Sequence, residues 1–363
     1  MLSFAAIDPY LEETMPRPVE TEVRGKNYVE WGTRNAYPSY LLELYNTVPT
    51  LRSIINGNVD FITGDNVRLD IPNRPGFMRR EIREQVKNIA RDFEIYGGFA
   101  LQVIRDFTGQ VAEVHYIDLR FLRTDKECTV FRYCEDWAKS GSHDITVYPA
   151  FVEGLDWAGL TPEERDRHAS SILYVKNEHT QTYPSPLYAA SVKDCEIERA
   201  ITDFHYNSLE NGFVSSAIVN FNNGVPTDEI REEIERDFNE KFSGHRNAGR
   251  IVFSWNRNKE SATEIIVPEV KDFGEKYHAL STHARQQIFA SFRAVPALFG
   301  IMTESTGFNE QEFQQAFRLY NRTQVRPVQR LIADAYEMIF NVPGCLNIKP
   351  FTLDEDAVDT IVN

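Results

Sequence analysis

Two long helical patterns separated by a short strand-rich segment constrain the fold of this chain more than any single motif does. The first pattern spans residues 185–212 and the second spans 272–293. The segment between them, 213–270, is typical of a compact strand–helix–strand–strand insert. A Gly-, Thr- and Ser-containing loop at 294–308 connects the second pattern to a third helical pattern at 309–341. This order predicts two rods with a small insert between them and a flexible bridge to a third helix.

The first half of the chain mixes helical and strand patterns. Two short helices are expected between residues 35 and 69, with Pro38 and Pro49 in their first turns, where a missing N–H costs little. A longer helix is expected over 78–96, with Gly97 and Gly98 at its end. Five strand-like runs follow up to residue 176, and the charged stretch LTPEERDRH between the last two predicts a surface excursion. Residues 1–184 therefore predict one α+β unit.

Some helix ends and irregularities are also predicted. Ser185 has the side chain of a helix N-cap, so the first long helix is expected to begin there. Pro327 lies within the third helical pattern and should bend it, because it removes a backbone hydrogen bond and crowds the preceding turn. After Gly344 the chain is short and acidic, so 342–363 is expected to be a frayed segment.

Composition excludes several classes of protein. The chain has 363 residues, of which 42% are hydrophobic, as expected of a folded protein. Its net charge of −15 argues against a protein that coats DNA, although looser contact inside a channel stays possible. The four cysteines form no metal-ligand spacing and predict reduced thiols. No apolar run is long enough to cross a bilayer, so no membrane partner is expected.

The usual signatures of catalysis are missing from the sequence. There is no phosphate-binding loop, no dinucleotide fingerprint, no H-E-x-x-H pair and no G-x-S-x-G elbow. We therefore expect no enzyme activity, no cofactor and no metal. The alternative is a metal-dependent nuclease or nucleotidyl-transfer enzyme, which would depend on a carboxylate such as Asp60 or Asp118. Asp60, Asp65 and Asp70 lie near one another in the chain but match no ligand loop.

The order of elements and several local motifs together resemble the portal proteins of tailed bacteriophages with HK97-type capsids. The resemblance covers roughly residues 35–340. Each motif is weak alone, and their order is the specific feature. Where family members often carry G-x-S-P-L, this chain has Tyr183-Pro184-Ser185-Pro186-Leu187. The motifs are, in order, NAYPSYLLELYNTVPTLRSIINGNVDFITG, YGGFALQVIRDFTGQVAEVHYID, SPLYAA, NAGRIVF, FRAVPALFGI and GFNEQEFQQAF followed by QVRPVQRLI.

The resemblance implies a portal fold and gives names to its parts. It implies a wing, two stem helices, a clip, a tunnel loop, a kinked wing helix and a short C-terminal segment or reduced crown. In order, these are residues 1–184 for the wing, 185–212 for the first stem helix, 213–270 for the clip, 271–293 for the second stem helix, 294–308 for the tunnel loop, 309–341 for the kinked helix and 342–363 for the C-terminal segment.

The resemblance also implies a function. Family members form a ring, usually a homododecamer, at one capsid vertex of the virion, after assembly in the host cytoplasm. Double-stranded DNA passes through the ring non-specifically during packaging and ejection. The implied partners are further copies of the chain, the large terminase, the head–tail adaptor and the major capsid or scaffolding protein. Another structural virion component, such as an adaptor or baseplate protein, is the remaining structural alternative.

Two sets of residues are candidates for contacts. The tunnel loop would place short polar groups and one carboxylate against DNA, which favours weak, sequence-blind contact. These residues are Met302, Thr303, Glu304, Ser305 and Thr306. The clip would dock a partner or a neighbouring subunit, and both possibilities stay open. Its candidate residues are Arg246, Arg250, Trp255, Arg257 and Lys259.

Overall fold

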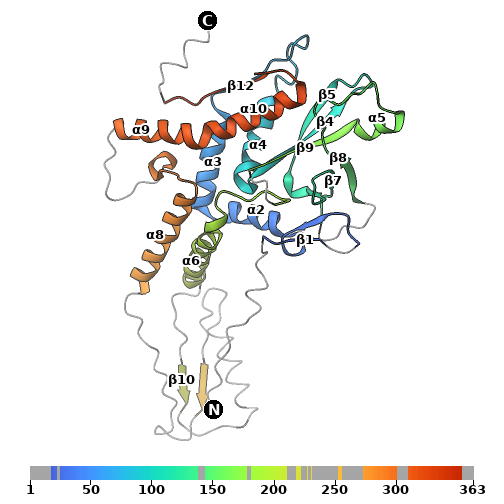
Figure 1. The fold of residues 1–363 in the computed structure, drawn as a ribbon. Helices are drawn as coiled ribbons and strands as arrows, with labels where there is room; N and C mark the ends of the chain where they lie inside the picture. The colour runs from blue at the N-terminus through green and yellow to red at the C-terminus, as the bar shows by residue number, and fades with distance from the viewer. Residues whose placement is uncertain are drawn as a thin grey trace. The chain divides into compact units, whose positions relative to one another are not determined.

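The structure is a computed structural model that divides the chain into two compact units (Figure 1). Unit 1 comprises Met1–Val192 and Gln287–Asn363, and unit 2 comprises Lys193–Gln286. The residues that the structure describes are 18–22, 25–137, 144–177, 181–210, 218–221, 227, 230, 252–255, 273–300 and 310–353.

Three helices near the N-terminus form the centre of unit 1. They are α2 (Tyr37–Thr47), α3 (Pro49–Thr63) and α4 (Ile82–Tyr96). The expected prolines do lie in the first turns of α2 and α3. The apolar stripe of α4 is buried as its helical spacing predicts, at Ile82, Val86, Ile89 and Phe93. Gly97 ends α4 in the left-handed region, with φ 88°.

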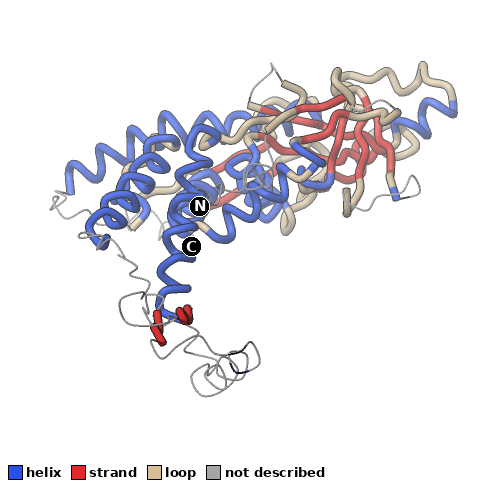
Figure 2. Tube along the Cα trace, turned by 90° about the horizontal axis from the view of Figure 1, so that it is seen from below, coloured by secondary structure: helices blue, strands red, loops and turns tan. Residues whose placement is uncertain are grey.

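A three-stranded antiparallel sheet packs against these helices. Its central strand is β4 (Gly98–Arg105), flanked by β5 (Val111–Ile117) and β9 (Ser170–Lys176). The expected hairpin between β4 and β5 is therefore confirmed. In Figure 1, α9 lies at the left of unit 1 and β4, β5 and β9 lie towards the right, with α10 running from α9 towards these strands. Figure 2 shows helices mostly at one end and strands towards the other.

Further strands form two small sheets in unit 1. One sheet has the order β6-β7-β8 and the other pairs β1 with β2. Their bounds are Leu122–Thr124 for β6, Val130–Tyr133 for β7, Thr146–Pro149 for β8, Glu20–Glu22 for β1 and Val29–Trp31 for β2. The short strand β6 was not predicted, because three residues carry too little alternation to identify a strand.

Arg123 of β6 lies in the core between the two small sheets. Its side chain is only 1% exposed, although arginine is rarely buried without a carboxylate. The guanidinium donates to Asn35 Oδ1 at 2.8 Å and to the Asn35 carbonyl at 3.0 Å. It also donates to the carbonyls of Arg120 and Leu122, at 2.9 Å and 2.6 Å. The rings of Trp31 and Trp137 lie 5.8 Å and 5.0 Å from its carbon.

The C-terminal part of unit 1 departs from the expected single helix. Helix α9 (Glu310–Tyr320) runs into a π-helical turn, η7 (Asn321–Val325), and then into α10 (Arg326–Phe340). The expectation of a frayed segment after Gly344 is wrong for residues 346–349, because β12 (Leu346–Lys349) pairs antiparallel with β3 (Asn66–Leu69). This pairing joins segments that are far apart in the sequence, which local patterns do not reveal. Residues 354–363 lie outside the described residues.

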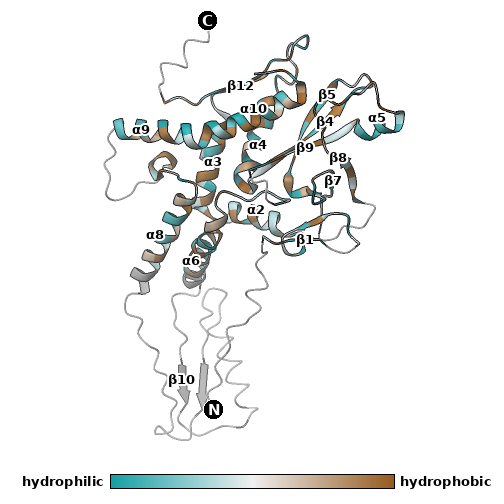
Figure 3. Ribbon diagram, in the orientation of Figure 1, coloured by the Kyte–Doolittle hydropathy of each residue, from teal (hydrophilic) through white to brown (hydrophobic). Residues whose placement is uncertain are grey.

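Two local expectations are corrected. The charged stretch before β9 is a helix, α5 (Pro162–His168), and Thr161 and Glu164 form a capping box at its start. Figure 3 shows α5 as hydrophilic, and none of its residues is buried. The first long helix begins later than Ser185, because a 3-10 turn, η4 (Ala189–Ser191), precedes it. Ser185 stands before Pro186, which disfavours the helical region, and its carbonyl accepts from Asn177 Nδ2 at 2.6 Å.

Unit 2 contains most of α6 (Val192–Glu210), α8 (Phe273–Ser291) and two strands. Strand β10 (Ile218–Phe221) pairs in parallel with β11 (Val252–Trp255), and a parallel pair requires a crossover of a dozen or more residues. The helix expected over 227–242 would supply that crossover, but it lies outside the described residues apart from positions 227 and 230. The Phe204 and Tyr277 rings stack at 5.0 Å between α6 and α8.

The α+β class is confirmed by this mixture of helices and mainly antiparallel sheets. All four cysteines are free thiols, and three of them are buried. In the part of the chain that the structure describes, every helix is too short or too polar to span a bilayer.

Candidate functional site: the base of the 301–309 segment

The described ends of the 301–309 segment lie in unit 1. On one side is η6 (Pro296–Phe299), a 3-10 turn that ends at Gly300, and on the other side is α9. The candidate DNA-facing residues, Met302 to Thr306, lie outside the described residues. What the structure gives is the base from which the segment departs.

The N-terminal end of the segment is held against α3 by Phe299. Gly57 lies in the middle of α3, and a Cβ built there would come within 2.7 Å of the Phe299 ring. Glycine at this position therefore lets the ring approach the helix backbone closely. Ser53 Oγ donates to the Phe299 carbonyl at 3.3 Å, which fixes the turn to the same helix face.

The C-terminal end of the segment packs on the same part of α3. The ring of Phe61 contacts Phe299 at 6.0 Å, Phe317 at 5.6 Å and Tyr320 at 6.4 Å, all edge to face. Phe351 joins them, with its ring 5.4 Å from Phe61. Edge-to-face pairs each contribute roughly 0.5–1.5 kcal/mol beyond the area they bury. We call these five residues, Phe61, Phe299, Phe317, Tyr320 and Phe351, the base cluster.

A buried polar chain stands beside the base cluster. Tyr320 Oη donates to Asn58 Oδ1 at 2.6 Å, and Asn58 Nδ2 donates to Glu94 Oε2 at 2.7 Å. Glu94 is only 2% exposed, and burial raises its pKa to about 7, although the Asn58 hydrogen bond opposes the shift. Two hydrogen bonds therefore connect the Glu94 carboxyl, through Asn58, to Tyr320, the last residue of α9.

Pro327 is the second residue of α10, directly after the π-helical turn. A proline removes the hydrogen bond to the residue four positions earlier, which here is Thr323 inside that turn. The wider π-helical turn accommodates this loss, and such turns are frequent at functional sites. The bend of the helix axis itself stays a prediction.

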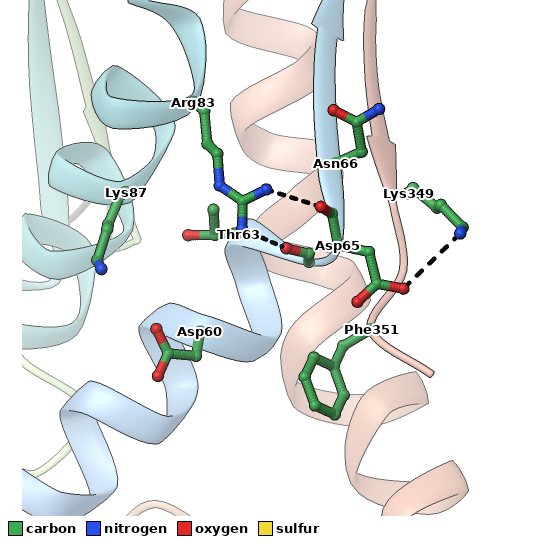
Figure 4. A pocket seen from close by; sticks show the side chains of 9 residues that line it. Asp60, Thr63, Asp65, Asn66, Arg83, Lys87, Lys349 and Phe351 are labelled. Atoms are coloured by element: carbon green, nitrogen blue, oxygen red, sulfur yellow. Dashed lines mark hydrogen bonds and ion pairs between the residues drawn. The ribbon is translucent and has the colours of Figure 1, made fainter. Parts of the chain in front are cut away.

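The candidate carboxylates do not form a metal-binding cluster. Asp60 and Asp65 line one pocket, shown in Figure 4, together with Arg83, Lys87 and Lys349. Arg83 donates to the Asp65 carbonyl at 2.7 Å, and Lys349 Nζ lies 4.0 Å from Asp65 Oδ2. Three cations therefore surround two carboxylates. No group of three or more His, Cys, Asp or Glu side chains in the described part of the chain could hold a metal ion.

The other two candidate carboxylates have structural contacts of their own. Asp70 lies outside that pocket, and its backbone N–H donates to the Cys345 carbonyl at 2.8 Å. Asp118 caps a short 3-10 turn by accepting from the Arg120 backbone N–H at 2.8 Å. None of these contacts favours the nuclease alternative.

The clip candidates are only partly placed. Trp255 is the last residue of β11 and pairs with Phe221 of β10. Arg246, Arg250, Arg257 and Lys259 lie outside the described residues, so their docking role stays a prediction.

Sequence reasoning missed the base cluster and Glu94. The five aromatic residues come from four separate segments, and no local pattern joins them. One signal was present, because a glycine in the middle of a strongly periodic helix indicates a close approach by another group. Nothing in the pattern of α4 distinguishes Glu94 from a surface carboxylate.

Comparison with known proteins gives three findings. Residues 79–349 match the phage portal protein family. An uncharacterized protein of Rickettsia felis is 29% identical over 181 residues, which is 47% of this chain and 44% of that protein. One of Rickettsia bellii is 27% identical over 185 residues, 47% of this chain and 45% of that protein. The chain thus matches less than half the length of these curated relatives.

The fold also resembles solved structures of particle necks. The neck of an empty GTA particle, computed with C6 symmetry, has a TM-score of 0.53 and 16% identity, covering 88% of this chain and 85% of that one. The neck of a native GTA particle, computed with C12 symmetry, has a TM-score of 0.51 and 16% identity, covering 87% and 84%. At this identity the likeness shows the fold alone. The family match spans more than half of the sequence, so this chain belongs to the phage portal protein family.

Proposed function

We propose that this chain is the subunit of a portal ring at one vertex of a virion, and that the ring surrounds a passage for double-stranded DNA. The observation that carries the proposal is the base cluster, which holds both ends of the 301–309 segment on α3. The two flanks of the segment, η6 and α9, would then occupy the same place in every copy. Repetition around an axis would then place Met302 to Thr306 at the passage.

The chemistry of these five residues fits a passage rather than a binding site. They include no cation, and Glu304 adds a negative charge. Each phosphate that a protein neutralises adds salt-dependent affinity, which would hold DNA in place. Twelve copies of a chain with a net charge of −15 would carry roughly −180, a field that opposes adhesion of DNA to the walls. We propose that this keeps DNA mobile, with no catalysis by the ring itself.

The ring number and the partners are part of the same proposal. The neck structure computed with C12 symmetry supports a ring of twelve copies, and the one computed with C6 symmetry supports ring assembly only. We further propose that residues 213–270 meet the large terminase and later the head–tail adaptor, and that the wing contacts the capsid or scaffolding protein. Assembly in the host cytoplasm would precede incorporation into the virion.

Electron microscopy of the purified full-length chain tests the proposal. We expect ring-shaped particles with a central opening, and the same ring at one vertex of the virion. A protein that stays monomeric across salt and protein concentrations, with virions whose vertex ring lacks this chain, would contradict the proposal.

A further inference from the structure

Four arginines form a regular row on the helix that follows the 301–309 segment. Arg318 lies in α9, Arg322 in the π-helical turn, and Arg326 and Arg330 in α10. They recur every fourth residue, the spacing that places side chains on one helix face. All four are exposed, and at about 1.5 Å per residue the row extends over about 18 Å. We call it the arginine row.

Two adjoining clefts show that the row is continuous across the π-helical turn. Arg318, Arg322 and Arg326 line one cleft, and Arg326 and Arg330 line the next. Lys349, at the end of β12, also lines the first cleft. Among the described residues, neither cleft has an aspartate or glutamate in its lining. The described lining of both clefts is therefore positive, in a chain whose net charge is negative.

The arginine row does not stabilise the folded subunit through ion pairs among the described residues. None of its four arginines makes an ion pair with a residue in the described ranges. Like charges four residues apart on a helix destabilise it by roughly 0.2–0.5 kcal/mol per pair. Four aligned cations with no ion pair to a described residue therefore add no stability through charge pairing within the described ranges, which favours a role in contacts outside the subunit.

We propose that the arginine row binds the phosphate backbone of double-stranded DNA. B-DNA carries one negative charge per about 1.7 Å of axis with both strands counted, so a duplex stretch as long as the row carries about ten phosphate charges, of which those on the near side can face the row. The guanidinium fork matches phosphate oxygens in a bidentate arrangement. A protein partner would need carboxylates at matching positions, whereas duplex DNA carries phosphate charges along its whole length. The inference relies on the proposed function only for the identity of the polyanion.

The arginine row and the proposed passage residues would make different contacts with DNA. Met302 to Thr306 offer no cation, whereas the row that begins at Arg318 offers four. Contact through backbone phosphates alone carries no sequence information. The row would therefore bind duplex DNA of any sequence, and the mobility of the DNA would depend on the absence of cations at residues 302–306 and on the chain's negative net charge.

The test measures how duplex binding by the full-length chain depends on salt. Fluorescence anisotropy of a short labelled duplex gives the affinity of wild type, the double variant R322Q/R326Q and the control R34Q/R167Q. The control removes the same charge from two exposed arginines, Arg34 in the 3-10 turn η1 (Thr33–Asn35) and Arg167 in α5. Each lost phosphate contact lowers the slope of log affinity against log salt by about 0.9, so we expect R322Q/R326Q to lose about 1.8. The ratio of its affinity for duplex at about 50 mM salt to that at about 200 mM salt should be roughly tenfold smaller than the same ratio for wild type.

Two further comparisons complete the design. The control and the charge-retaining variant R322K/R326K should keep the wild-type slope, and an unrelated duplex sequence should give the same values. An unchanged slope in R322Q/R326Q, or an equal loss in R34Q/R167Q, overturns the proposal. So does a loss of rings by electron microscopy with unchanged duplex affinity, because the row would then join subunits. Wild-type protein that binds duplex but never forms rings would contradict the proposed function and leave this inference standing.

Discussion

The substitution Arg123→Met is expected to lower the free energy of unfolding by about 2–4 kcal/mol. Burial lowers the pKa of Arg123 to about 10, so holding this charge in the core costs about 3 kcal/mol. Methionine would recover that cost but would leave the carbonyls of Asn35, Arg120 and Leu122 without their donor. Buried acceptors without partners cost about 1–3 kcal/mol each, and the loss of three outweighs the gain.

Urea unfolding followed by tryptophan fluorescence measures the effect, since Trp31 and Trp137 flank the guanidinium. Arg120→Met is the matched control, because Arg120 is on the same segment but half-exposed, with a 3.4 Å ion pair to Asp118. The two side chains of this pair are 32% and 25% exposed, and pairs that keep contact with solvent contribute about 0–1 kcal/mol. An equal decrease in the free energy of unfolding for the two variants would contradict a stabilising role for the buried hydrogen bonds of Arg123.

The second large effect is a pH dependence that originates at Glu94. Its carboxyl has a pKa of about 7 in the folded protein, against 4.5 as the ordinary value. The folded state therefore binds the proton more tightly than the unfolded state, and stability falls as the pH rises from about 4.5 through 7. A difference of this size corresponds to about 3 kcal/mol.

The variant Glu94→Gln isolates this effect, because glutamine keeps an acceptor for Asn58 Nδ2 and does not ionise. We expect it to match wild type below about pH 4 and to exceed it by about 3 kcal/mol above pH 7. Glu84→Gln is the control, since Glu84 lies exposed on the same helix and should change stability by less than about 0.5 kcal/mol. Chemical denaturation across this pH range is the measurement, and parallel curves for wild type and Glu94→Gln would contradict the account.

Local periodicity predicted the elements that are built from contiguous residues. The stripe Ile82, Val86, Ile89 and Phe93 identified α4 and its buried face, and Gly64 marked the end of α3. Gly64 has φ 64°, and a Cβ there would lie 2.1 Å from the Lys349 carbonyl, so the same glycine also admits β12. The sequence revealed the turn but not the strand that passes beside it.

The features that sequence reasoning missed depend on contacts between distant segments. Arg120 and Arg123 look equivalent in the chain, and only the fold buries one and leaves the other half-exposed. The base cluster joins α3, η6, α9 and the segment after β12, which no single window contains. The four-residue spacing of the arginine row is visible in the sequence. The clefts that these arginines line, and the absence of carboxylates from the described lining, are visible only in the fold.

The proposal that residues 302–306 line a passage for DNA can be tested by locating them relative to the duplex. Cryo-electron microscopy of DNA-filled particles would locate them in the assembled ring. We predict that Met302 to Thr306 of every copy face the duplex around a shared axis, with Phe299 and Tyr320 packed on α3 behind them. Density that places these residues on the outer rim, remote from that axis, would contradict it.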